Sequence, residues 1–171
     1  MKVCFDPQPA FTIVTDKDRQ FLATIVTLVT VAAAEKLSQA DAQARLEAAG
    51  ISASSSGGCV DPSDGTCTSY EGINLATVEG AITLKEACAC DVTITGGTET
   101  GHGTGEYSHA NGYKLDLAKE GGLDGYVTGT FTQIEDRGDG YPQWEAGSGN
   151  IYCVSLRRVS MLGSAALTCA F

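Results

Sequence analysis

The chain has 171 residues, of which 43% are hydrophobic, a fraction that supports a buried core and excludes wholesale disorder. Its length suits one domain with a flanking segment left over. The formal net charge of −10 argues against nucleic acid as a partner, because Lys and Arg contacts to phosphate dominate such binding. It also argues against electrostatic attachment to anionic lipid and is typical of a soluble acidic surface.

The N-terminal region carries an uncharged apolar run at residues 21–34. Lys17 and Arg19 precede the run, and three alanines end it. This order predicts a secretory signal or a short membrane anchor, although the run is shorter than the roughly 20 residues of a full span. An ordinary buried or amphipathic helix is the alternative. With the signal or anchor, the protein is extracytoplasmic, either secreted or held in the cell envelope.

A helix and a linker follow. Residues 37–51 predict a helix that Ser38 caps, and the Ser/Gly-rich residues 52–58 predict a flexible linker. We therefore expect a boundary near residue 57. It separates a signal- or anchor-like segment with its helix and linker (residues 1–56) from the domain proper (residues 57–171).

The domain proper predicts an α+β fold. A helix is expected from Thr68 or Ser69 to about Ala87, and a weaker, glycine-containing helix at 121–129. Alternating or β-rich segments bounded by turns predict strands at 91–95, 113–117, 131–135, 141–145 and 150–156. This order indicates a small antiparallel sheet with flanking helices.

Seven cysteines are many for this length. Cys59 and Cys67 flank a Pro/Gly/Asp loop of the kind that a short disulfide closes, with a stabilisation of about 2–3 kcal/mol. Disulfides agree with an exported protein, whereas free thiols in a reducing cytosol are the alternative. Because the count is odd, at least one thiol is free or pairs with another chain.

The sequence contains only two histidines, His102 and His109, and Asp116 lies seven positions after the second. Neutral imidazole and carboxylate are ligands that zinc prefers. Asp116 stands between Leu115 and Leu117 in a predicted strand, so its side chain faces away from theirs and is either exposed or in a functional cleft. A His–Asp pair at this spacing alone often has no role in metal binding.

The residues around His109 and Asp116 strengthen the prediction of a zinc site. Ser108-His109-x-x-Gly112-x-Lys114-x-Asp116 resembles the S-H-x-x-G-x-A-x-D signature of D-alanyl-D-alanine carboxypeptidases and related cell-wall endopeptidases. That family shares its fold with the N-terminal signalling domain of hedgehog proteins. The resemblance implies that His109 and Asp116 are zinc ligands of a peptidase that acts on peptidoglycan peptides.

The resemblance extends over roughly residues 68–152, and the strand and glycine turn at 92–97 look like the family strand before its substrate loop. In the family a late histidine is the third ligand, but no histidine follows Asp116 here, and the tail 153–171 has no Trp-His pair. His102 is the first substitute, with Glu145 or a reduced Cys153 as alternatives.

The family often has an arginine in the substrate loop, and here residues 98–100 read Thr-Glu-Thr. Glu99 is a candidate ligand or the general base of a hydrolase. Four aromatic residues could line a groove for glycan or peptide stems, or simply pack: Tyr107, Tyr113, Tyr141 and Trp144.

Three functions follow as hypotheses. The first is a zinc-dependent peptidase on peptidoglycan stem peptides. The second is a degenerate, non-catalytic version that binds wall peptide or has a structural role. The third is a small disulfide-stapled envelope module without a metal.

Overall fold

A computed structural model describes residues 35–119, 122–136, 140–154 and 159–162. The predicted signal or anchor at 21–34 lies outside these residues. Within the described ranges, no helix has the length and apolar character needed to cross a membrane.

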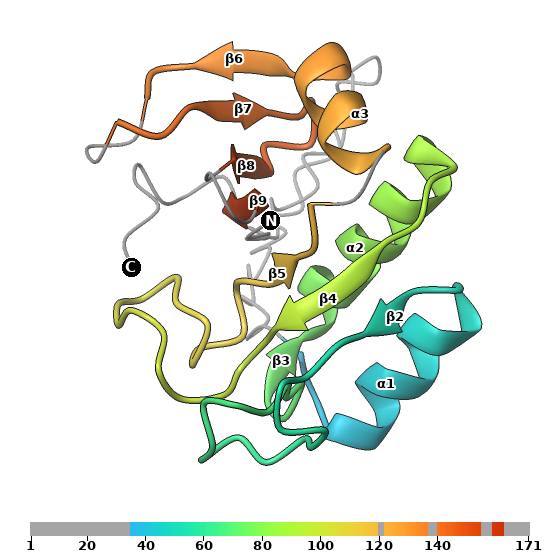
Figure 1. Cartoon of the computed structure of the whole chain (residues 1–171), viewed down its shortest axis with the longest axis vertical. Helices are drawn as coiled ribbons and strands as arrows, with labels where there is room; N and C mark the ends of the chain where they lie inside the picture. The colour runs from blue at the N-terminus through green and yellow to red at the C-terminus, as the bar shows by residue number, and fades with distance from the viewer. Residues whose placement is uncertain (1–34, 120–121, 137–139, 155–158, 163–171) are drawn as a thin grey trace, which may run out of the picture.

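The described residues form a mixed α+β structure, as the sequence predicts (Figure 1). Their three helices are α1 (Gln39–Ala48), α2 (Leu75–Cys88) and α3 (Leu123–Thr130). The strands are β1 (Lys36–Leu37), β2 (Ser52–Ala53), β3 (Ile73–Asn74), β4 (Thr93–Gly96), β5 (Asp116–Leu117), β6 (Thr132–Ile134), β7 (Gln143–Glu145), β8 (Ile151–Val154) and β9 (Val159–Leu162).

Seven strands form one sheet in the order β2-β4-β5-β9-β8-β7-β6, and β1 pairs separately with β3. The expected antiparallel pairing holds throughout both sheets except between β2 and β4, which are parallel. The strands β6, β7 and β8 form the meander predicted from the turns between them. β5 lies in the interior of the large sheet, between β4 and β9, and it carries Asp116.

The helix α1 begins as predicted, because the Ser38 hydroxyl oxygen accepts a hydrogen bond from the Asp41 N–H. Its buried residues Ala42 and Leu46 belong to the main hydrophobic core. The packed unit thus extends N-terminal to the boundary expected near residue 57. The prediction of a flexible linker is wrong at Ser52 and Ala53, which pair with β4 as strand β2.

The helix α2 begins at Leu75, later than the expected start at Thr68 or Ser69. The reason is tertiary: the Ser69 carbonyl oxygen accepts a hydrogen bond from the Thr98 N–H at 2.7 Å. A helical conformation would direct that carbonyl along the helix axis instead. Residues 68–70 are therefore buried as irregular chain beside the loop that follows β4.

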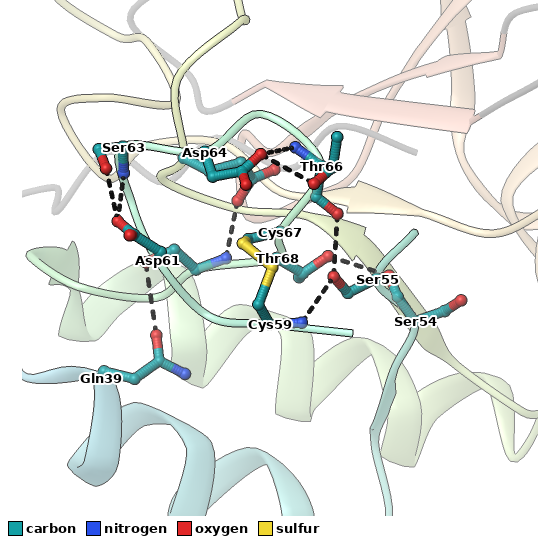
Figure 2. The surroundings of a disulfide bond; sticks show 12 residues. Gln39, Ser54, Ser55, Cys59, Asp61, Ser63, Asp64, Thr66, Cys67 and Thr68 are labelled. Carbon is teal, nitrogen blue, oxygen red and sulfur yellow. Dashed lines mark hydrogen bonds between the residues drawn. A yellow bond between two sulfur atoms is a disulfide. The ribbon is translucent and has the colours of Figure 1, made fainter. Parts of the chain in front are cut away.

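The expected disulfide between Cys59 and Cys67 is present, and Figure 2 shows its surroundings. The loop that it closes contains two aspartate turns, in which Asp61 accepts from Ser63 and Asp64 accepts from Thr66. A second disulfide, which was not expected from the sequence, joins Cys88 to Cys90 at the end of α2.

A long loop between β4 and β5 carries most of the candidate site residues. The segment between β4 and β5, drawn mostly in yellow in Figure 1, leaves the sheet as a long loop and returns to β5. Glu99, His102 and His109 all lie on this loop. It begins and ends on paired neighbouring strands, so residues from both of its ends meet beside the sheet.

Candidate metal centre

The turn at 108–112 explains the spacing of the S-H-x-x-G motif. The Gly112 N–H donates to the His109 carbonyl oxygen at 2.7 Å, and the Tyr113 N–H donates to the Ser108 carbonyl oxygen at 3.1 Å. Gly112 has a φ of 75°, in the left-handed region that favours glycine. The turn therefore fixes His109 at the end of the loop, just before the chain enters β5.

Asp116 is placed by the alternation of β5. Its neighbours Leu115 and Leu117 are fully buried in the core, while its own side chain, 1% exposed, points into the candidate site. Asp116 pairs with Gly96 of β4 across a register shift. A Cβ atom at Gly96 would lie 3.1 Å from both an Asp116 and a Glu99 carboxylate oxygen, so only glycine leaves ordinary room for both acids.

The structure brings together all three residues predicted as metal ligands. His102, His109 and Asp116 each offer a donor atom, and these atoms lie within 4.8 Å of one another. His109 Nε2 is 3.5 Å from Asp116 Oδ1, and His102 Nδ1 is 3.8 Å from Asp116 Oδ2. The two imidazole rings are stacked, with centroids 3.8 Å apart and planes 13° from parallel.

Hydrogen bonds at the far sides of the rings define both tautomers. His109 Nδ1 lies 2.6 Å from the Gly97 carbonyl oxygen, which can only accept, so this nitrogen carries the proton. His102 Nε2 lies 2.9 Å from a carboxylate oxygen of Glu99 and must likewise donate. In the neutral rings, the remaining lone pairs of both histidines then face Asp116.

Glu99 is 2% exposed and contacts the Nε2 side of the His102 ring, whereas Asp116 faces Nδ1. Its carboxylate also accepts the Ser69 N–H at 2.7 Å and the Gly97 N–H at 3.0 Å. Burial raises the pKa of Glu99, but the hydrogen bonds from His102, Ser69 and Gly97 outweigh it and leave the pKa below its usual value. The group is thus an ionised acceptor inside the protein.

This donor set can hold a metal ion. Two neutral imidazoles and one carboxylate are the protein ligands found in catalytic zinc sites, which keep a fourth position open. A tetrahedral ion with ligand distances of about 2.0–2.2 Å separates its ligands by roughly 3.3–3.6 Å. The 3.5 Å separation of His109 Nε2 from Asp116 Oδ1 lies in that range, and the 3.8 Å separation of His102 Nδ1 from Asp116 Oδ2 is slightly longer. His102, with 15% of its side chain exposed, is the most accessible of the three.

The alternative late ligands do not join this group. Glu145 is exposed on β7, and Cys153 is buried on β8 in a smaller cluster with Ile151. Neither belongs to a potential metal-binding group among the described residues. Of the aromatic candidates, Tyr107 and Tyr113 pack edge to face, with centroids 5.2 Å apart.

Trp144, another aromatic candidate, is partly buried and packs against the main core.

A second group of residues with metal-like spacing consists of Cys59, Asp64 and Cys67. Its two sulfurs are joined in the disulfide, so they are not available as thiolate ligands.

Sequence reasoning missed the residues that support the candidate ligands. Gly97 serves both histidines, because its carbonyl oxygen accepts from His109 and its N–H donates to Glu99. Ser69 contributes a backbone N–H from a segment 30 residues earlier in the chain. The Gly96-Gly97 pair was visible as a turn signal, but backbone contacts of this range leave no pattern in the sequence.

The loop position where the resembling family often has an arginine is turned inward. Thr98 is buried and its hydroxyl donates to the Ser69 carbonyl oxygen, while Glu99 faces His102. Comparison with protein-family models, with curated proteins and with solved structures found no match to this chain.

Proposed function

We propose that the protein is a zinc-dependent peptidase that acts on peptidoglycan stem peptides, similar to D-alanyl-D-alanine carboxypeptidases. The observation that carries the proposal is the convergence of His102, His109 and Asp116 on one point. The resemblance of the S-H-x-x-G motif to the signature of that family supports the class of enzyme, and the turn formed by its glycine and histidine positions His109.

In this proposal His102, His109 and Asp116 hold the ion. Zinc bound by two imidazoles and a carboxylate supplies a Lewis acid that polarises a carbonyl group and activates water. The protein's own contribution is to fix the tautomers of both histidines and to bury Asp116. Substrate would approach next to His102, which is the most exposed of the three residues, with 15% of its side chain accessible. The disulfides support an extracytoplasmic site of action, where peptidoglycan is found.

A non-catalytic envelope module is the second candidate, and one observation favours it. Glu99, the expected general base, has both carboxylate oxygens engaged by N–H donors. A module with the same site would bind metal and wall peptide without hydrolysing it.

The test uses the full chain produced by export, so that its disulfides form. We expect about one zinc per chain by elemental analysis, and release of D-alanine or shortened stem peptides from purified muropeptides by mass spectrometry. His109→Ala and Asp116→Asn should lose both, whereas Glu106→Gln, an exposed acid on the same loop, should lose neither.

Three outcomes are distinct. A correctly folded chain that binds no zinc at neutral pH would overturn the proposal. Zinc binding without hydrolysis of any muropeptide would favour the non-catalytic module. Hydrolysis that persists in His109→Ala would show that the reaction takes place elsewhere.

A further inference from the structure

Glu99 occupies an unusual position for a general base. One of its oxygens accepts the Ser69 N–H at 2.7 Å, and the other lies 2.9 Å from His102 Nε2, while Gly97 N–H donates to both at 3.0 Å. A general base needs an oxygen within reach of the proton that it removes. Here each oxygen already faces a donor, and the carboxylate lies on the side of His102 away from Asp116.

We propose that Glu99 is a positioning residue that holds His102 with its Nε2 protonated and its Nδ1 directed at the metal ion, and that it is not the general base. This inference rests on the proposed metal site. A carboxylate bonded to the outer nitrogen of a ligand histidine fixes the ring orientation and raises its basicity as a ligand.

His102 needs such a partner more than His109 does. It lies between Gly101 and Gly103, where the backbone has wide conformational freedom, and Gly101 has a φ of 98°. His109 is almost fully buried and is held by a backbone carbonyl. The described contacts that orient His102 are the bond to Glu99 and the stacking on His109.

The substitution Glu99→Gln tests the role without a change of size. If the new amide NH₂ faces His102, the ring must accept at Nε2 and move its proton to Nδ1, which removes the lone pair that faces Asp116. If the NH₂ instead faces Ser69 and Gly97, donors oppose donors inside the protein. Both arrangements weaken the site, whereas loss of a base alone would leave metal binding intact.

The experiment reads the tautomers directly. The chain has only two histidines, so long-range ¹H–¹⁵N spectra of the full, metal-free protein contain two imidazole patterns. We expect His102 to be protonated at Nε2 and His109 at Nδ1. In Glu99→Gln, the His102 pattern should change while that of His109 stays. Cobalt(II) titration, followed by its visible absorption, should show affinity reduced about 10–100-fold.

Glu106→Gln is the matched control, because it removes the same charge from an exposed position of the same loop. It should retain wild-type cobalt affinity, with His102 protonated at Nε2 and His109 protonated at Nδ1. Full cobalt affinity in Glu99→Gln, with only hydrolysis lost, would identify Glu99 as the base and overturn the inference while the peptidase proposal stands.

A wild-type His102 protonated at Nδ1 would also overturn it, and this measurement does not depend on a variant that folds. A wild-type chain that binds neither cobalt nor zinc would remove the proposed function and the inference together. Weak cobalt binding in Glu99→Gln with intact wild-type hydrolysis would support both.

Discussion

His109 Nδ1 lies 2.6 Å from the carbonyl oxygen of Gly97, and the N–H of the same glycine donates to Glu99. Gly97, the residue immediately after β4, therefore connects the hydrogen-bond partners of both histidines. The close approach depends on glycine, since a Cβ at position 97 would lie 2.0 Å from the Ser69 carbonyl oxygen. That oxygen belongs to the backbone, so it has little room to move.

Gly97→Ala should therefore weaken both folding and metal binding. Separating two backbone segments to admit the methyl group costs at least about 1–3 kcal/mol of unfolding free energy. The displacement also pulls the Gly97 carbonyl from His109, so zinc affinity should fall. Urea unfolding with and without zinc measures both effects.

Gly125→Ala provides the contrast, because nothing lies within 4 Å of a Cβ there and the residue is inside α3. It should raise the unfolding free energy by about 0.5–1 kcal/mol and leave zinc binding unchanged. Equal stability of Gly97→Ala and wild type would contradict the tight contact between residues 69 and 97.

The motif glycine offers a second comparison. Gly112 and Gly58 both have positive φ, at 75° and 63°. A Cβ at Gly58 meets nothing within 4 Å, whereas one at Gly112 would lie 2.7 Å from the Gly72 carbonyl oxygen and 2.8 Å from Asn74 N. Gly58→Ala should cost about 1–2 kcal/mol of unfolding free energy from the left-handed conformation alone.

Gly112→Ala carries the same conformational cost plus the collision, so its loss should exceed that of Gly58→Ala by about 1–3 kcal/mol. Thermal unfolding of the two variants side by side measures the difference. Because the turn at 108–112 positions His109, zinc should stabilise Gly58→Ala but not Gly112→Ala. Matching melting curves for the two variants would contradict this account of the motif.

The ligand set could be predicted from the sequence because it depends on residue type and local order. Only two histidines were available, and the motif placed Asp116 on a strand with its side chain opposite Leu115 and Leu117. The structure confirms that placement, and it brings His102, the predicted substitute for the missing late histidine, next to His109 and Asp116. The buried, hydrogen-bonded position of Glu99 could not be predicted, since it depends on backbone N–H groups of Ser69 and Gly97.

The parts of the fold that the sequence missed share a physical cause. β1, β2 and β3 have two residues each, too few for a periodic pattern. The apparent helix start at Thr68 was overridden by long-range contacts to the loop after β4. Longer segments with regular patterns, such as α1 and β8, were predicted close to their observed bounds.

Alkaline pH should destabilise the chain through two buried tyrosines. Burial, together with the charge of Glu99 and of Glu47, raises the pKa of Tyr70 well above its usual value, and burial also raises the pKa of Tyr152. Above a pH of about 10, the unfolded chain releases these protons while the folded chain retains them. The unfolded state then binds fewer protons, so the unfolding free energy falls as pH rises.

Two measurements check this expectation. Near-ultraviolet titration of the native protein should show two of the six tyrosines ionising only when the chain unfolds. Tyr70→Phe should remove part of the alkaline loss in urea unfolding, after any constant offset at neutral pH is subtracted. A Tyr70→Phe variant whose stability falls with pH as steeply as wild type would contradict the assignment.

The Cys59–Cys67 disulfide should support the metal centre as well as the fold. The Thr68 N–H donates to the Cys59 carbonyl oxygen, and the next residue is Ser69, whose N–H holds Glu99. Within the disulfide loop, the Pro62 carbonyl oxygen accepts the Thr100 N–H at 2.8 Å. Cys59→Ser with Cys67→Ser should lower the unfolding free energy by about 2–3 kcal/mol.

The same double variant should also bind zinc several-fold more weakly, because residues 99–102 lose part of their backbone support. The control is Cys88→Ser with Cys90→Ser, which opens the other described disulfide at the end of α2. Among the described residues, Cys88 and Cys90 form no hydrogen bond with Glu99 or His102, so the loss of this disulfide should change stability but leave zinc affinity near the wild-type value. Calorimetric zinc titration of both double variants separates the effects. Equal losses of zinc affinity would indicate a general loosening of the fold, whereas a loss confined to Cys59→Ser with Cys67→Ser ties this loop to the site.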